Sequence, residues 1–167
     1  KISEMDVKYE GTKYLTKATA QAKAVVHIDL PQDKYSFNGV MAKLNDLDFT
    51  ADGFFQFKKE DILTDVTFKT ASESFKSLLS LLPSAYTKDF ASVKSSGKAS
   101  FDGYVKGAYN GSLGKYPAFD IKIKVDNGYV KYPGMTQEIK DVFADMRIKA
   151  ARSDYKDMNI NIPTFRL

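Results

Sequence analysis

The sequence predicts a mainly β protein: a curved antiparallel sheet, as a β-sandwich or an open groove, with one helical segment inserted near residues 73–93. Three observations support this fold class. Apolar and polar residues alternate with period two along most of the chain, as in strands with one covered face. One central stretch instead repeats its apolar residues every three to four positions. The 167 residues are 43% hydrophobic and 28% charged, which is typical of a globular protein rather than a disordered one.

The first long strand is predicted over residues 16–30, where the even positions are apolar and the odd positions are mostly polar. Successive strand side chains point to opposite faces, so this pattern gives one apolar face. Alanine is a poor strand former, but its small side chain leaves space beside a sheet. The apolar positions are Ala18, Ala20, Ala22, Ala24, Val26, Ile28 and Leu30.

Seven further strands are predicted from the same alternation, over residues 35–44, 47–57, 62–68, 99–109, 121–125, 144–150 and 158–162. In the first of these the apolar parity switches across Asn38-Gly39, which indicates a bulge or a turn. Asp52-Gly53, Asp102-Gly103 and Asn127-Gly128 are likewise predicted to be tight turns or bulges. The regular polar–apolar alternation favours antiparallel pairing with one face in water.

The helical segment is predicted where Phe75, Leu78, Leu79 and Leu82 follow the i, i+3, i+4, i+7 spacing. Residues 86–93 repeat this spacing after Pro83, which predicts a second short helix. Ser72 or Ser74 is the expected N-cap. We expect the apolar stripe to pack on the sheet, with binding to a membrane surface as the alternative.

A chain of this length is predicted to form a single β-rich domain, residues 1–167, with two strand groups, 1–72 and 94–167, around the helical segment. It begins at Lys1 without an initiator methionine, so we expect a fragment of a longer protein. Its longest nearly unbroken apolar stretch, residues 78–82 with Ser80 inside it, is much shorter than the roughly 20 residues of a membrane-spanning helix.

The sequence offers little for catalysis. It has no cysteine and a single histidine, His27, on the polar side of its predicted strand, so thiol nucleophiles and multi-histidine metal sites are excluded. Nucleotide-binding and hydrolase motifs are also absent. We therefore predict no catalytic, cofactor-binding or metal-binding residues, no cofactor and no enzyme activity. Asp46, Asp48 and Asp52 could imitate a calcium loop, but the apolar residues between them favour a strand. Carboxylates whose spacing in space is unknown leave a hydrolase as a third class.

The net charge of +4 is unevenly distributed. Residues 1–83 hold 11 basic and 12 acidic side chains, whereas residues 84–167 hold 14 and 9. A basic half can bind nucleic acid or an anionic membrane. Lys122, Lys124, Arg147 and Lys149 alternate with apolar residues, however, so we interpret them as a solvated strand face and expect no nucleic-acid partner.

The chain contains 12 Phe and 10 Tyr. Phe54, Tyr104, Tyr129 and Tyr132 occupy positions where an exposed ring would stack on a sugar or a base. Packing on the sheet is the competing interpretation, because aromatic residues are favoured in strands. These rings make a β-sandwich adhesion or glycan-binding module the alternative function.

Several segments of the second half share a pattern with a known family. They are LLPSAYTKDF at 81–90, SGKASFDGYVKG at 96–107, PAFDI at 117–121, NGYVKYP at 127–133 and INIPTF at 160–165. Together they resemble the C-terminal periplasmic region of AsmA-like proteins of the Bacteroidetes type, in the superfamily that includes TamB. The resemblance covers residues 70–167 well and the first 70 loosely.

This resemblance implies a non-enzymatic segment of a Gram-negative cell-envelope protein that takes part in outer-membrane biogenesis and in phospholipid handling or transfer. The parent chain would be anchored in the inner membrane, with this segment in the periplasm. The implied partners are phospholipid acyl chains and other segments of the parent chain. The family has no catalytic residues to transfer to this sequence.

If the sheet forms a lipid groove, its wall must be apolar and free of unpaired hydrogen-bonding groups. The longest such wall lies along the first strand, and the best candidate for a facing wall lies near residue 123. The candidate lipid-facing residues are Ala22, Ala24, Val26, Ile28, Leu30, Ile121, Ile123 and Val125. The pattern alone leaves open whether this face holds lipid or forms an ordinary core.

Overall fold

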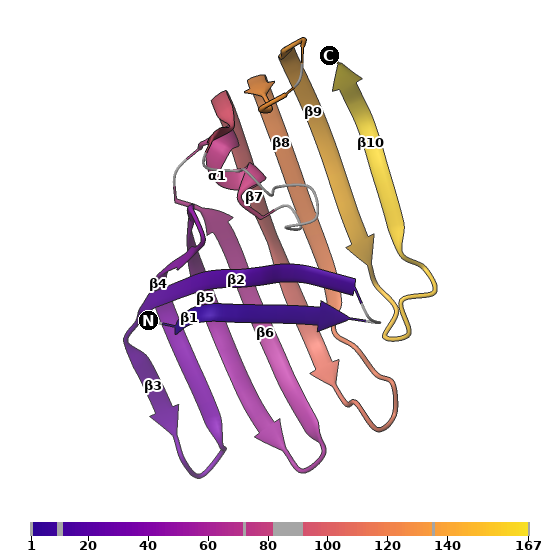
Figure 1. Ribbon diagram of the computed structural model, residues 1–167. Helices are drawn as coiled ribbons and strands as arrows, with labels where there is room; N and C mark the ends of the chain where they lie inside the picture. Colours follow the sequence, from indigo (N-terminus) through magenta and orange to yellow (C-terminus); the bar gives the residue numbers. More distant parts are fainter. Residues whose placement is uncertain (1, 10–11, 72, 82–91, 135, 167) are drawn as a thin grey trace.

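The computed structural model describes residues 2–9, 12–71, 73–81, 92–134 and 136–166, with the side chains described from Ala18 onward. The chain forms one antiparallel sheet of ten strands with a single short helix in the described residues (Figure 1). The elements are β1 (Ile2–Tyr9), β2 (Thr12–Lys23), β3 (Val26–Asp29), β4 (Lys34–Leu44), β5 (Leu47–Lys58), β6 (Asp61–Thr70), α1 (Phe75–Leu79), β7 (Lys94–Tyr109), β8 (Ala118–Lys131), β9 (Ile139–Ala150) and β10 (Asn159–Arg166).

The sheet follows the order of the chain, β1-β2-β4-β5-β6-β7-β8-β9-β10, and β3 pairs with the free half of β4. Strands before and after α1 join directly, because β6 pairs with β7 over eight residues in unbroken register. The prediction of a mainly β, antiparallel fold is confirmed. Of the two architectures left open, the structure has a single open sheet rather than two packed sheets.

The registers gather the apolar positions on one face. Val66 of β6 lies opposite Val105 of β7, which lies opposite Phe119 of β8, which lies opposite Ala150 of β9. Side chains alternate between the two faces along every strand. Since these four residues share one face, the residues next to them in each strand lie on the opposite face. We call the two surfaces the apolar face and the polar face.

The parity switch at Asn38-Gly39 is a β-bulge, as predicted. The register of β4 and β5 shifts between Phe37 and Val40, and the Asp52 carboxylate accepts the Gly39 N–H at 2.6 Å. The bulge keeps Phe37 and Val40 on the same face although they are three residues apart. Asn127-Gly128 also lies at a register shift, in β8.

The prediction of a turn or bulge at Asp102-Gly103 is wrong: both residues lie in the regular ladder between β7 and its neighbours. Glycine is needed there for close packing, since a Cβ on Gly103 would lie 2.3 Å from the Asp120 carbonyl oxygen. Gly53 in β5 has the same role, with a Cβ position 2.0 Å from the Asp65 carbonyl oxygen. Neither glycine reverses the chain.

The prediction of one strand over residues 16–30 is also wrong, because the strand breaks at Ala24 and Val25 into β2 and β3. Only residues 20–23 of β2 pair with β4, and β3 pairs with the other half of β4. Away from these paired residues the β1–β2 hairpin runs across the sheet on the side of α1 (Figure 1). Asn45 links these parts: its Oδ1 accepts the Thr19 N–H at 3.1 Å, and its Nδ2 donates to the Ser80 carbonyl at 2.9 Å.

The described helix spans only Phe75–Leu79, shorter than the predicted segment 73–93. Ser74 is its N-cap and accepts the Ser77 N–H at 3.2 Å, so the expectation for Ser74 is met. The second helix predicted after Pro83 falls largely on residues 82–91, which lie outside the described residues. Phe75 packs with Ala99, Val125 and Val142 in a buried cluster on the apolar face. The helix thus covers one end of this face, as its apolar stripe predicted.

Candidate functional site

Beyond the end covered by α1, the apolar face is hollowed by a depression of about 380 Å³, which we call the apolar trough. Its lining is almost entirely apolar, and it is partly open to solvent. Its side chains come from β5, β6, β7 and the residue that precedes β8. They are Phe55, Ile62, Thr64, Val66, Val105, Tyr109 and Pro117.

The depth of the trough follows from glycine. Gly107 lies opposite Thr64 in the ladder, between the Val66–Val105 row and the Ile62–Tyr109 row. Since Gly107 has no side chain, the floor of the trough is lower at this position than at the two rows of side chains beside it. The rim remains accessible: Phe55 is 41% exposed and Tyr109 is 42% exposed. Large hydrophobic side chains are therefore held in water around a concave apolar surface.

Thr64 is the one hydroxyl-bearing residue that lines the trough apart from Tyr109. It is 7% exposed, and its Oγ1 atom has no hydrogen-bond partner in the described part of the chain. The hydroxyl oxygen is turned out of reach of solvent. A buried hydroxyl without a partner costs stability, so a threonine at this position is not explained by packing alone.

An exposed apolar surface extends from the trough to the β3 edge of the sheet. The rings of Phe37 and Phe55 lie 5.8 Å apart, and those of Tyr35 and Phe57 lie 5.7 Å apart in a T-shaped arrangement. These aromatic pairs connect β4 to β5 on the apolar face. On β3, Val26 pairs with Phe37 and Ile28 pairs with Tyr35, so both continue the same surface.

The candidate lipid-facing residues of the first predicted strand are exposed to different degrees. Val26 is 46% exposed and Ile28 is 52% exposed on β3, next to the aromatic pairs. Ala22 lies at the end of β2, Ala24 lies in the break between the strands, and Leu30 lies in the turn after β3; all three are exposed.

The second predicted wall belongs to the same sheet rather than to a facing one. Ile121 and Ile123 are half-buried in the middle of β8, on the apolar face. Val125 is 9% exposed and belongs to the buried cluster beneath Phe75. Val125 is therefore a core residue, while β4–β7 separate the other two from Val26 and Ile28.

The centre of the trough was missed by the sequence analysis. Most of its residues lie in predicted strands, but none is among the candidate lipid-facing residues. A signal was present in the alternation itself, since Gly53 and Gly107 interrupt two runs of apolar residues. Each such glycine removes one side chain from a continuous surface, and neighbouring strands can align these gaps.

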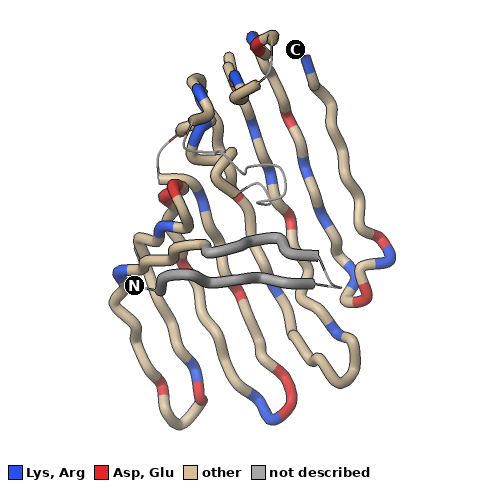
Figure 2. The backbone as a smooth tube through the Cα atoms, viewed as in Figure 1, with Lys and Arg blue, Asp and Glu red and all other residues tan. Residues whose placement is uncertain are grey.

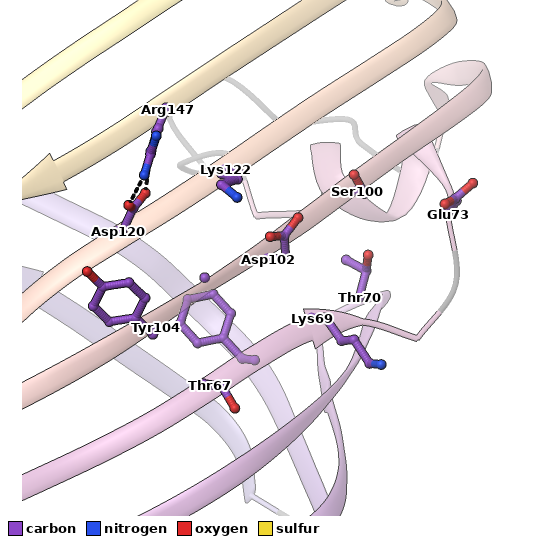
Figure 3. Close-up of a pocket in the computed structure, with 12 residues that line it drawn as sticks. Thr67, Lys69, Thr70, Glu73, Ser100, Asp102, Tyr104, Asp120, Lys122 and Arg147 are labelled. Carbon is purple, nitrogen blue, oxygen red and sulfur yellow. Dashed lines mark hydrogen bonds and ion pairs between the residues drawn. The ribbon is translucent and has the colours of Figure 1, made fainter.

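The polar face has a hollow of its own, of about 650 Å³, which we call the polar hollow (Figure 3). Tyr104, Asp120 and Arg147 lie at one end, and Thr70, Ser100 and Glu73 lie toward the other (Figure 3). Its remaining lining includes Thr67, Lys69, Asp102 and Lys122. Tyr104 is 40% exposed, so of the two interpretations left open for this ring the structure favours the exposed one.

Basic residues recur along β8 and β9, with acidic residues among them (Figure 2). Lys122, Lys124, Arg147 and Lys149 are all exposed, which fits a solvated strand face. Arg147 donates from Nε to the Asp120 Oδ1 at 2.8 Å, and its Nη2 donates to the Asp120 Oδ2. Asp120 is itself 8% exposed. The hydrogen bonds from Arg147 hold the pKa of Asp120 below its ordinary value.

This pair predicts acid sensitivity. Because the pKa of Asp120 is lowered on folding, the pair stabilises the protein above the ordinary carboxylate pKa of 3.8 and loses this effect as the pH falls through the lower folded value. Arg147→Met is expected to lower the urea midpoint at pH 7, and the difference from wild type should shrink below about pH 4. Arg152→Met, which breaks a more exposed pair with Asp154, is the control and should change little. Equal effects of both variants at pH 7 would contradict this prediction.

His27 is exposed on β3. Among the residues that the structure describes, no group of three or more His, Asp or Glu side chains is placed to hold a metal ion. In the same residues, no helix is long and apolar enough to span a membrane. Comparison of the chain with protein-family models, with curated proteins and with solved structures finds no match.

Proposed function

We propose that this chain is a non-enzymatic, lipid-handling segment of a cell-envelope protein of the AsmA-like type, and that the apolar trough holds lipid acyl chains. The observation that supports this proposal most directly is the trough itself. It is a solvent-open, concave surface with almost no polar atom on its lining. Together with the exposed apolar side chains that continue it toward β3, it forms a surface of the kind that often marks a binding site.

The chemistry of the trough suits an acyl chain. An alkyl chain makes no hydrogen bonds, so it needs a wall without unpaired polar groups, and each methylene removed from water contributes about 0.8 kcal/mol. The trough continues into the aromatic pairs of β4 and β5 and reaches Val26 and Ile28 on β3. A linear apolar ligand would therefore find a path along several strands rather than a single pocket.

The wider setting of the proposal comes from the sequence resemblance. On this basis the parent protein is anchored in the inner membrane, and this segment works in the periplasm in outer-membrane biogenesis. Other segments of the parent would extend the apolar face so that phospholipid passes along it. The open sheet supports this arrangement because a sheet without closure can be lengthened strand by strand.

The test compares two tyrosines of the same strand. Tyr109 lies in the trough and Tyr104 on the polar face, and their exposures are 42% and 40%. The protein is incubated with vesicles of phosphatidylethanolamine and phosphatidylglycerol, re-purified, and examined by native mass spectrometry for bound phospholipid. We expect wild type and Tyr104→Asp to retain lipid and Tyr109→Asp to lose most of it.

Both variants must keep the wild-type melting temperature. We expect this result because the two tyrosines are similarly exposed. Thr64→Val adds a further control: it removes the unpartnered hydroxyl while keeping the shape of the side chain, so it should leave lipid binding intact and not lower stability. The proposal would be refuted if the wild-type protein retained no lipid, or if both tyrosine variants lost lipid equally.

A glycan-binding module is the second candidate, and the polar hollow is the observation that favours it. An exposed tyrosine ring stands there beside hydroxyl and charged side chains, which is the composition of many saccharide sites. The same two variants separate the functions. Binding to a glycan array that Tyr104→Asp abolishes and Tyr109→Asp preserves would support the glycan module instead.

A further inference from the structure

The polar hollow contains opposite charges that face one another without pairing. Asp102 of β7 lies directly opposite Lys69 of β6 on one side and Lys122 of β8 on the other. In the described part of the chain neither lysine forms an ion pair with Asp102, and no dashed line joins them in Figure 3. Neighbouring strands lie about 4.8 Å apart, so the three charges form a short row across the hollow.

Elsewhere on the polar face, charges that lie directly opposite each other do pair. Lys106 Nζ lies 2.8 Å from the Asp65 carboxylate across β7 and β6. Lys124 Nζ lies 3.8 Å from the Asp145 carboxylate across β8 and β9. The same strands therefore allow a cross-strand ion pair outside the hollow. Within the hollow, the charged groups beside Asp102 remain available to a ligand.

The cationic side of the hollow suits a phosphate group. Lys122 lies directly opposite Arg147 of β9, and like charges in this position repel each other. Asp120 is buried and holds the Arg147 guanidinium through Nε and Nη2, so among the described residues Nη1 keeps its donors for another acceptor. An anion placed between Lys122 and Arg147 would offset their repulsion. Two adjacent cations match the charge of a phosphate better than that of a carboxylate.

The anionic side of the hollow suits an ammonium group. Asp102 is half-buried, and its carboxylate has no hydrogen-bond or ion-pair partner among the described residues. Tyr104 follows two residues later on the same face of β7, with an exposed ring. A carboxylate attracts a cation directly, and an aromatic ring attracts it through the negative face of its π system. Ser100, two residues before Asp102, adds a hydroxyl to the same lining.

We propose that the polar hollow binds a dipolar ligand in which a phosphate and an ammonium group lie a few bonds apart, as in phosphoethanolamine. The phosphate contacts Lys122 and Arg147, and the ammonium group contacts Asp102 and Tyr104. This ligand supplies the ion pairs that are missing in the hollow, whereas a neutral saccharide supplies none. The volume of about 650 Å³ admits the group free or as a phospholipid headgroup. The site lies on the face opposite the apolar trough, so it does not depend on the proposed acyl-chain binding.

The first experiment measures the binding of phosphoethanolamine, inorganic phosphate and ethanolamine by isothermal titration calorimetry. We expect the wild-type protein to bind phosphoethanolamine more tightly than either of its parts. Asp102→Asn should weaken phosphoethanolamine binding by at least about tenfold, because it removes a charge-assisted contact. The same variant should bind inorganic phosphate no more weakly than wild type. Lys122→Gln should weaken the binding of both phosphate-containing ligands.

The matched controls are Asp65→Asn and Lys106→Gln, which make the same changes on β6 and β7 in an ion pair outside the hollow. Both should bind phosphoethanolamine like wild type. The source of the ligand is tested in the Tyr109→Asp background with vesicles of phosphatidylethanolamine and phosphatidylglycerol. If the ligand is a headgroup, vesicles bind, free phosphoethanolamine displaces them, and adding Asp102→Asn abolishes the binding. If it is a small molecule, only free phosphoethanolamine binds.

Three results would each overturn the proposal: phosphoethanolamine bound no more tightly than inorganic phosphate, equal weakening in the Asp102 and Asp65 variants, or a hollow that binds neutral saccharides and no dipolar ligand. Tyr109→Asp should bind phosphoethanolamine like wild type, because Tyr109 lies in the trough on the other face. Failure of this site and failure of the proposed lipid function are thus observed separately.

Discussion

The Val125→Asp variant is expected not to reach a stable folded state. Val125 is 9% exposed and packs with Phe75, Ala99 and Val142 beneath α1. A carboxylate there has no basic partner in the cluster, and an uncompensated buried charge costs about 3–5 kcal/mol. Since domains are stable by only about 5–15 kcal/mol, most of the stability would be lost. Thermal unfolding followed by circular dichroism measures the effect.

The matched control is Val26→Asp, the same change on the same face at a site that is 46% exposed. We expect this variant to fold with a melting temperature close to that of wild type, because its carboxylate stays in water. If the two variants melted alike, the division of the apolar face into a covered core and an open surface would be wrong. Val26→Asp should also weaken lipid retention if acyl chains extend from the trough to β3.

The second large effect is expected for Gly53→Ala. A Cβ at this position would lie 2.0 Å from the Asp65 carbonyl oxygen and 2.8 Å from the Val66 Cα, which are backbone atoms of β6. Gly53 also has a φ of +144°, where other residues are strained by about 1–3 kcal/mol. Because β5 and β6 must separate to admit the methyl group, we expect a loss above this range in urea denaturation.

The Gly39→Ala variant separates the effect of backbone strain from that of steric collision with a neighbouring strand. Gly39 has a φ of +61°, but nothing lies within 4 Å of its Cβ position, so only the left-handed conformation is penalised, by about 1–2 kcal/mol. The Asp52 carboxylate still accepts the backbone N–H of the variant. Equal losses in both variants would show that close approach of β5 and β6 is not what requires glycine at position 53.

Several elements were predictable because their signals are local. The alternation in residues 47–57 and 62–68 predicted β5 and β6, and the parity switch at Asn38-Gly39 predicted the bulge of β4. The N-cap at Ser74 followed from its position before an apolar stripe. In each case the conformation depends on neighbours within a few residues, so the pattern is sufficient evidence.

The errors came from interactions between distant residues. The even positions stay apolar from Ala18 to Leu30, yet the strand divides at Ala24 and Val25 because β2 and β3 pair with different halves of β4. Asp102-Gly103 has the composition of a turn, but its glycine serves to bring β7 close to β8. Neither outcome is encoded in the residues beside the position concerned.

The candidate site shows the same division. The sequence by itself determined which side chains share a face, since a strand turns each residue opposite to its neighbours whatever lies beside it. It thereby placed Val26, Ile28, Ile121 and Ile123 on the apolar face. Only the tertiary structure decided which parts of that face are covered. Burial depends on where α1 lies, on the order of the strands and on which residues a glycine such as Gly107 faces in the ladder, and these are set by contacts between residues far apart in the chain. Val125 became core and the trough stayed open for this reason.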